Sequence, residues 1–306
     1  MYKSLDELVA AAVSEGPAAI AVACGQDPDV LQALKQAQSM GLAQGILVGD
    51  RSRMEPMVEK VGLEPAPDQM IHEPDQARAA RKAIGLIREG RASLLMKGKI
   101  NTSTLVRAVL DRENGLRTGR LLSQVIVFQV PGIQRLMVMT DAAINIAPNL
   151  AQKAEICRNA IEVAHAIGVP EPNLAALCAL EFVNPEMPAT LDAAGLTLMN
   201  RRGQISGAYI EGPIALDSPL SRFAAERKGI DSPLVEATDI FLAPDIEAAN
   251  ILYRAILYFA QGESGGIVLG ARVPLILLSR AETPETKIRS IALAVLVGKA
   301  AGGAAG

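Results

Sequence analysis

The sequence predicts an α/β fold in which mostly parallel sheets are flanked by helices. Short apolar segments alternate with helical patterns along the 306 residues, as they do in successive strand–helix–strand units. Half of the residues are apolar but only 3% are aromatic. Ala, Val, Ile and Leu must therefore fill the core, which is typical of buried parallel sheets.

The amino-terminal elements form one strand–helix–strand unit. Ser4 and Glu7 have the spacing of a capping box and begin the first helix. Residues 18–25 form a strand, a helix begins at Pro28, and residues 43–50 form the next strand. Because a helical crossover joins these two strands, we expect them to be parallel.

The same alternation continues to the end of the chain. Further strands are predicted at residues 93–97, 125–128, 135–140, 174–182, 206–212, 239–244 and 274–278. The segments that alternate with them are residues 102–110, a long helix after Asn149, residues 191–200, residues 220–229, a helix after Asp245 and a helix from Pro284. No internal repeat or low-complexity linker interrupts this pattern.

Charge and targeting signals exclude several classes of function. The net charge of −3 argues against broad attraction to nucleic acid, for which a basic patch is expected. Asp6 and Glu7 lie within the first apolar segment, which excludes a secretory signal peptide. No run approaches the ~20 apolar residues that span a bilayer. We therefore expect a soluble, cytoplasmic protein.

Cysteine and histidine give no sign of a metal site. Cys24, Cys157 and Cys178 are far apart and form no CxxC pair, which points to a reducing compartment and buried thiols. His72 and His165 have no partner at ligand spacing. We expect no bound metal and no tightly bound cofactor.

The segment after the strand at residues 274–278 has the character of an anion site. The pair Ser279-Arg280 precedes a helix start, with Thr283 at the N-cap and Glu285 in the first turn. A hydroxyl and a guanidinium thus stand beside free helical N–H groups, which favour anions. The plain alternative is an ordinary strand–loop–helix joint with a surface arginine.

A second segment, MKGKINTSTLVR, has the composition of a phosphate-binding turn. Gly98 permits close backbone approach, two lysines supply charge, and hydroxyl groups stand at a helix start. It lacks the spacing of a Walker loop, and the plain alternative is a strand-to-helix turn. The candidate phosphate-binding residues are Lys97, Gly98, Lys99, Thr102, Ser103 and Arg107.

These motifs and several others stand in the order found in one enzyme family. The carboxyl-terminal series is Asp239, Pro244-Asp245, Asn250, Tyr253, Gly270, Pro274 and Ser279-Arg280. Together with MKGKINTSTLVRAVL and MTDAAINIAPNLAQK, this series resembles the phosphate acetyl/butyryltransferase family over most of the chain. The block from Asp141 to Asn145 is closer to the butyryl branch than to the acetyl branch.

The resemblance implies a fold and an activity. It implies a two-domain, isocitrate/isopropylmalate dehydrogenase-like architecture with the active site in the interdomain cleft. Residues 1–142 and 265–306 would form one domain, and residues 143–264 a second domain inserted between them. The implied reaction is the reversible transfer of a short acyl group, preferably butyryl, between coenzyme A and orthophosphate. Coenzyme A would be a substrate, the partners would be small molecules, and the protein would be a homodimer.

The resemblance also implies catalytic roles, with one departure from the family pattern. Arg280 would stabilise developing negative charge and Ser279 would donate a hydrogen bond to the oxyanion or thioester. The position of the acetyl branch's proposed thiol base is Thr286 here, so either the adjacent Glu285 or the substrate phosphate would take the proton. Asp141, Asn145 and Asn250 would bind substrate in the cleft, although an acid at a strand end is often a turn or cap residue.

Three alternatives stay open at this point. The chain can be a phosphate acetyltransferase, since pocket depth and acyl-chain length depend on side chains that only the fold brings together. It can be a non-catalytic acyl-CoA-binding protein that has lost its base at Thr286. Metal-dependent oxidative decarboxylation on the same scaffold is disfavoured, because the sequence has neither an Asp-x-x-x-Asp array nor a GxGxxG turn in a strand–helix unit.

Overall fold

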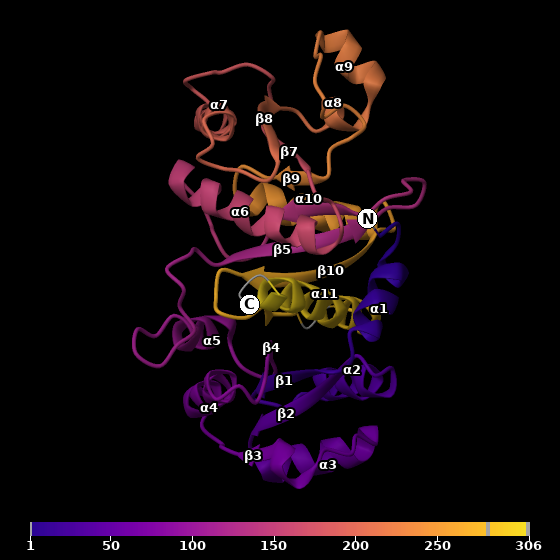
Figure 1. Ribbon diagram of the computed structural model, residues 1–306, viewed down its shortest axis with the longest axis vertical. Helices are drawn as coiled ribbons and strands as arrows, with labels where there is room; N and C mark the ends of the chain where they lie inside the picture. The colour runs from indigo at the N-terminus through magenta and orange to yellow at the C-terminus, as the bar shows by residue number, and fades with distance from the viewer. Residues whose placement is uncertain (1, 280–281, 304–306) are drawn as a thin grey trace. The chain divides into compact units, whose positions relative to one another are not determined.

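The computed structural model describes residues 2–279 and 282–303. Contacts between residues divide the chain into two compact units (Figure 1). Unit 1 comprises Met1–Leu5 and Leu121–Ser264, and unit 2 comprises Asp6–Arg120 and Gly265–Gly306.

Unit 2 contains a sheet with the strand order β3-β2-β1-β4-β11-β10. Its strands are β1 (Ala18–Ala23), β2 (Ala43–Gly49), β3 (Met70–His72), β4 (Leu94–Lys97), β10 (Glu263–Leu269) and β11 (Leu275–Ile276). The pairs from β3 to β11 are parallel, and β10 is antiparallel to β11. The carboxyl ends of the parallel strands therefore meet at one edge of this sheet.

Acidic side chains cap several helices of unit 2 at their amino termini. The helices are α1 (Leu5–Ser14), α2 (Pro28–Ser39), α3 (Arg51–Val61), the 3₁₀ helix η1 (Pro67–Gln69), α4 (Gln76–Arg88), α5 (Thr102–Val109) and α11 (Pro284–Gly303). The carboxylates of Asp27, Asp50 and Asp75 each accept a backbone N–H in the first turn of α2, α3 and α4. Each of these caps directly precedes its helix.

Unit 1 contains strands in the order β5-β6-β9-β7-β8. The strands are β5 (Ser123–Gln129), β6 (Met137–Thr140), β7 (Asn173–Leu177), β8 (Tyr209–Ile214) and β9 (Ile240–Leu242). The helices are α6 (Leu150–Ala166), α7 (Pro188–Arg201), α8 (Asp217–Leu220), α9 (Arg222–Lys228) and α10 (Ile246–Tyr258). Strands β6, β9, β7 and β8 are parallel, and β5 is antiparallel to β6.

The expected α/β fold, with mostly parallel strands flanked by helices, is confirmed. Sequence reasoning missed α3, β3 and α4, and it also missed β10, whose Gly265-Gly266 pair weakens the apolar pattern of a strand. The strand predicted at residues 174–182 was too long, because β7 ends at Leu177.

The division into units differs from the expected domains in two places, the first of which is Met1–Leu5, assigned here to unit 1. The expectation assigned residues up to 142 to the first domain, whereas Leu121–Ser264 belong to one compact unit. The physical reason is strand pairing, since β6 pairs with both β5 and β9. Both divisions separate residue 264 from residue 265.

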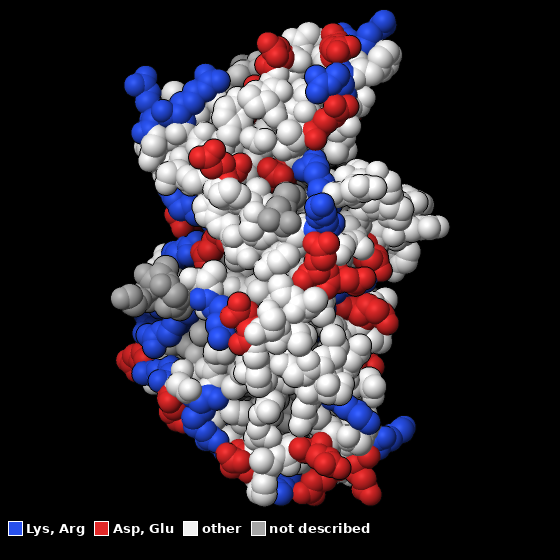
Figure 2. All heavy atoms as spheres, turned by 45° about the vertical axis from the view of Figure 1, so that its right-hand side comes forward, with Lys and Arg blue, Asp and Glu red and all other residues white. Residues whose placement is uncertain are grey.

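The surface carries charges of both signs. Figure 2 shows acidic and basic side chains mixed over the face in view, with uncharged areas between them. Among the described residues, no helix is both long enough and apolar enough to cross a membrane. The same residues contain no group of three His, Cys, Asp or Glu side chains that could hold a metal ion.

Candidate functional site

In unit 2, the two candidate anion-binding segments follow neighbouring strands. Strands β4 and β11 are parallel, with Leu95 opposite Leu275 and Met96 opposite Ile276. Lys97 ends β4, and Ser279 lies three residues beyond the end of β11. The structure therefore brings the Lys97–Ser103 segment and Ser279 to the same edge of one sheet.

The amino terminus of α5 is exposed and lacks a side-chain cap. Asn101 occupies the N-cap but, among the described residues, makes no side-chain capping bond to the first turn. Thr102 and Ser103 are exposed at this end, and Arg107 is exposed one turn further along. First-turn N–H groups that lack a side-chain cap bind water or anionic ligands, as the sequence pattern predicted for a phosphate.

The lysines of this segment differ in exposure. Lys97 is half-buried at the end of β4, and its ammonium lies 3.5 Å from the carbonyl oxygen of Gly98. Lys99 is exposed, while its carbonyl oxygen accepts a hydrogen bond from the Gln76 amide at 3.2 Å. Lys99 thus has a fixed backbone and a side chain in contact with solvent.

The backbone of Gly98 packs against the turn that follows β1. Its N–H donates to the carbonyl of Ala23 at 2.9 Å, and the N–H of Lys99 donates to the carbonyl of Cys24 at 2.8 Å. A Cβ atom at Gly98 would lie 2.1 Å from the Cys24 carbonyl oxygen. The close approach that the sequence predicted at Gly98 is therefore, in the first place, an approach to another part of this chain.

The start of α11 is built by hydroxyl capping and a buried lysine. Arg280 lies outside the described residues, and Ser279 is exposed, with its carbonyl accepting the N–H of Glu282 at 3.2 Å. The hydroxyl of Thr283 accepts the N–H of Thr286 at 3.2 Å, which confirms Thr283 as the N-cap. Lys287 is buried and donates to the carbonyl of Glu282 at 2.7 Å.

The environment of Glu285 makes it a weaker base than an ordinary glutamate. Its side chain is exposed in the first turn of α11. Its own backbone N–H, the Thr283 hydroxyl and the nearby Arg289 and Lys287 all lower the pKa of this carboxyl. A lowered pKa stabilises the carboxylate and reduces its affinity for a thiol proton.

In unit 1, Asp141 organises the loop that follows β6. Its carboxylate accepts the N–H groups of Ala143 and Ile144 at 3.0 Å, and the N–H of Asn145 at 3.1 Å. The side-chain amide of Asn145 donates to the same carboxylate at 2.6 Å. Burial raises the pKa of Asp141, while these hydrogen bonds act in the opposite direction.

Asn145 and Asn250 complete this second cluster. Asn145 also donates to the carbonyl of Leu122 at 2.8 Å, and Asn250 donates to the carbonyl of Ala142 at 3.2 Å. The structure thus brings Asp141, Asn145 and Asn250 together in unit 1. Nearby, Asp245 caps α10, because its carboxylate accepts the N–H of Ala248 at 2.8 Å.

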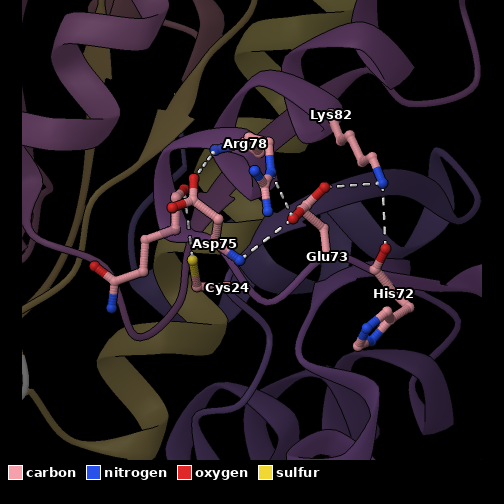
Figure 3. A network of polar contacts seen from close by, with 7 residues as sticks. Cys24, His72, Glu73, Asp75, Arg78 and Lys82 are labelled. Atoms are coloured by element: carbon pink, nitrogen blue, oxygen red, sulfur yellow. Dashed lines mark hydrogen bonds and ion pairs between the residues drawn. The ribbon is translucent and has the colours of Figure 1, made fainter.

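A charged network that sequence reasoning missed holds the carboxyl end of β3 in unit 2 (Figure 3). The buried Glu73 pairs with Arg78 at 3.0 Å and with Lys82 at 3.1 Å, and both cations lie on α4. These two partners, Arg78 first, lower the pKa of Glu73 to about 2. The available signal was the i, i+4 spacing of Arg78 and Lys82 after the capping residue Asp75.

The thiol nearest to this network is held in its protonated form. Cys24 directly follows β1, and its sulfur is 3.9 Å from the carbonyl oxygen of Gln76 (Figure 3). Burial, reinforced by Asp75, raises the pKa of Cys24 to about 11. Burial also raises the pKa of Cys157 to about 12 and that of Cys178 to about 11. Raised pKa values disfavour the thiolate that a cysteine nucleophile requires.

Comparison with known proteins shows which family the sequence of this chain matches. The family model described as "Phosphate acetyl/butaryl transferase" matches residues 68–295. The phosphate butyryltransferase of Clostridium acetobutylicum is 43% identical over 97% of this chain and 99% of its own length. The phosphate acetyltransferase of Rhizobium meliloti is 42% identical over 95% of this chain and 92% of its own length.

Solved structures share the fold. A branched-chain phosphotransacylase from Enterococcus faecalis V583 has a TM-score of 0.78 at 30% identity, and the match covers 92% of this chain and 99% of that one. A 4-hydroxythreonine-4-phosphate dehydrogenase from Klebsiella pneumoniae has a TM-score of 0.54 at 15% identity, and the match covers 92% of this chain and 99% of that one. At this low identity, the similarity to the dehydrogenase concerns the fold alone.

Proposed function

The chain belongs to the phosphate acetyl/butyryltransferase family, and on this premise we propose that it transfers a short acyl group reversibly between coenzyme A and orthophosphate, with butyryl preferred. The observation that carries this proposal is the 43% identity to a phosphate butyryltransferase over 97% of the chain. The products in one direction are acyl phosphate and free coenzyme A. Coenzyme A is then a substrate rather than a bound cofactor.

The proposed phosphate site is the open amino terminus of α5. Thr102 and Ser103 offer hydroxyl and backbone donors, while Lys97, Lys99 and Arg107 supply positive charge. A helix amino terminus combines unpaired N–H groups with a favourable dipole for an anion. Gly98 supports this site indirectly, because it lets the turn after β1 pack against the loop that leads to α5.

In the proposed reaction, a phosphate oxygen attacks the thioester carbonyl and the carbon–sulfur bond breaks after a tetrahedral intermediate. Arg280 and Ser279 stabilise the negative charge that develops on the carbonyl oxygen. The proton carried by the attacking phosphate passes to the departing thiolate, which leaves as the thiol. In reverse, a phosphate oxygen of the acyl phosphate takes the thiol proton.

The remaining assignments follow from family membership. Asp141, Asn145 and Asn250 are proposed to bind substrate through the loop after β6, which their hydrogen bonds also shape. The active site is predicted to lie in a cleft between two domains. The protein is further proposed to be a cytoplasmic homodimer whose other partners are small molecules.

The first expected result concerns the reaction and its acyl specificity. Thiol should be released from butyryl-CoA only when phosphate or arsenate is present, without added metal or nicotinamide. Butyryl-CoA has two more methylenes than acetyl-CoA, and each is worth about 1–3 kcal/mol in an apolar pocket. We therefore expect kcat/KM for butyryl-CoA to exceed that for acetyl-CoA by at least about tenfold. A disulfide reagent that reacts with free thiol measures the phosphate dependence of thiol release and the kcat/KM for each acyl-CoA.

Other results of this assay separate the alternatives. Efficient turnover of acetyl-CoA with a poor rate for butyryl-CoA would make the chain a phosphate acetyltransferase, which the 42% identical relative also allows. Acyl-CoA binding by calorimetry without any turnover would indicate a non-catalytic binding protein. Thiol release that does not depend on phosphate would contradict the proposed reaction.

A second expected result concerns the thiol base. We expect Glu285→Gln to lower kcat by less than about tenfold, whereas loss of a general base costs about 10²–10⁴-fold. The reason is that Glu285 is an exposed first-turn residue with a lowered pKa. Its carboxylate favours the helix dipole by ~0.3–1 kcal/mol, and this contribution fades as pH falls through the lowered pKa.

The pH–rate profile gives the decisive measurement for Glu285. Its acidic limb should be the same in Glu285→Gln and in the wild type. Glu247→Gln is the matched control, because Glu247 is also the second residue of a helix and is exposed on α10. A flattened acidic limb in Glu285→Gln, absent from Glu247→Gln, would identify Glu285 as the base.

A further inference from the structure

Lys287, the fourth residue of α11 in unit 2, is a buried cation without an acidic partner. Only 5% of this residue is exposed. Among the described residues, no carboxylate lies within ion-pair distance of its ammonium. Lys153, the other lysine that is buried in the described part of the chain, pairs with Asp192 at 2.7 Å. Because burial of an unpaired charge costs free energy, packing alone does not account for Lys287.

The ammonium of Lys287 holds the loop between β11 and α11. It donates to the carbonyl of Glu282 at 2.7 Å, while the backbone N–H of Lys287 donates to the carbonyl of Thr283 at 3.1 Å. The bond to Thr283 belongs to the ordinary pattern of an α-helix. The bond to Glu282 is made only because this side chain reaches back along the loop. One residue thus binds two successive carbonyls.

The bond to Glu282 reaches Ser279 within the same turn of the loop. The N–H of Glu282 donates to the carbonyl of Ser279 at 3.2 Å. Glu282 is therefore restrained on both sides, by Ser279 through its N–H and by Lys287 through its carbonyl. Loss of the ammonium would free that carbonyl and weaken the restraint on the turn that begins at Ser279.

Helix α11 gives Lys287 a fixed base. The hydroxyl of Ser290 accepts the N–H of Gly266 at 2.9 Å, which ties the helix to β10. A Cβ atom at Gly265 would lie 2.8 Å from the carbonyl carbon of Arg289, so β10 and α11 are already in close contact. A donor on such a rigid element can fix the position of a neighbouring loop.

A purely stabilising role fits this lysine poorly. Its hydrogen bond to Glu282 favours the folded state, but the desolvation of the ammonium opposes that gain. An apolar side chain of the same length would fill the same space without the cost of a buried charge. The cation therefore contributes more to the position of the loop than to the stability of the fold.

We propose that Lys287 is a positioning residue, which acts through Glu282 to hold Ser279 and the Arg280 that follows it in the sequence. Arg280 itself lies outside the described residues. The inference rests on the proposed function, in which this pair stabilises the negative charge on the carbonyl oxygen. Misplacement of such a group by about 1 Å can lower a rate by about 10²-fold.

The test compares Lys287→Met with the wild type, because methionine removes the ammonium and keeps most of the side-chain length. With butyryl-CoA and phosphate, kcat should fall by about 10–10²-fold. The KM for phosphate should change by less than about threefold, since a group that acts in the transition state affects kcat. Hydrogen exchange should become faster in peptides that cover residues 279–286. The thermal unfolding midpoint should shift by less than about 3 °C.

Two further variants make the result specific. Lys287→Arg keeps a cationic donor in the same place and should have a kcat between those of Lys287→Met and the wild type. Lys299→Met is the matched control, because Lys299 also lies on α11 but is exposed, and its ion pair with Glu15 is long at 4.0 Å. This control should keep the wild-type kcat and the wild-type exchange over residues 279–286.

The outcomes separate the role of Lys287 from the reaction itself. A wild type that releases no thiol with phosphate would overturn the proposed function, and the role of Lys287 with it. An active wild type with the same kcat in Lys287→Met would overturn the role of Lys287 alone.

The other outcomes concern Lys287 only. A Lys287→Met protein that lacks the wild-type helix content in circular dichroism would make the lysine a folding residue and overturn the proposal. A Lys287→Arg enzyme no faster than Lys287→Met would also count against it decisively. A lower kcat and faster exchange in Lys287→Met, with neither change in Lys299→Met, would support it.

Discussion

Replacing Arg280 by alanine is expected to lower kcat by about 10²–10³-fold, or roughly 3–4 kcal/mol in the activation free energy. Arg280 lies outside the described residues, but in the sequence it directly follows Ser279, which lies beyond β11 at the sheet edge that also leads to α5. A donor that acts on charge present only in the transition state changes kcat more than KM. Steady-state kinetics with butyryl-CoA and phosphate measure the two parameters separately.

Two further variants make this result specific. Arg280→Lys keeps the charge but loses the planar fork of the guanidinium, and it should recover only part of the activity. Arg53→Ala removes an exposed arginine from α3 and should leave kcat unchanged. If Arg280→Ala kept the wild-type kcat, the catalytic centre would have to be sought elsewhere.

The alternation of strands and helices could be predicted because each unit buries its strands between helices. Strand β6, for example, is buried along its whole length. A nearly continuous apolar run in the sequence predicts a buried strand of this kind. Strand β3 gives no such signal, since it is a three-residue edge strand that contains the exposed His72. Short edge strands carry little apolar pattern, and their existence depends on pairing with a neighbour.

The candidate site could be predicted in part. Thr283 was identified as the cap of α11 from local chemistry alone, and the structure places it there. By contrast, the partners of Asp141 are set by the loop geometry after β6, so its four hydrogen bonds could not be foreseen from spacing. The pairing of Glu73 with Arg78 and Lys82 likewise depends on how α4 packs beside β3.

At Gly98, the sequence correctly predicted a close backbone approach but not the group that makes it. Close backbone approach was expected there because a phosphate would need it. In the structure, the approaching group is the backbone of Cys24, which has a positive φ of 62° after β1. The same glycine therefore fixes the distance between the turns after β1 and β4. Any phosphate bound at α5 depends on that distance.

We accordingly expect Gly98→Ala to destabilise the protein by about 2–6 kcal/mol. The new Cβ would lie 2.1 Å from the carbonyl oxygen of Cys24 and 2.8 Å from its carbonyl carbon, and neither backbone atom can move alone. Relief requires the two turns to separate, which weakens the bonds from Gly98 and Lys99 to Ala23 and Cys24. Overpacking costs about 1–3 kcal/mol and each lost hydrogen bond about 0.5–1.5 kcal/mol.

Urea denaturation measures this loss, and Gly85→Ala provides the control. Within 4 Å of a Cβ at Gly85 lies a single atom, the Glu89 Oε1 at 3.9 Å, and alanine favours a helix interior by about 0.5–1 kcal/mol. Gly85→Ala should therefore be neutral or stabilising. The folded fraction of Gly98→Ala should also show a raised KM for phosphate, because separation of the turns displaces the loop before α5. Unchanged stability would mean that the turns can part freely, whereas lower stability with an unchanged KM would confine Gly98 to a structural role.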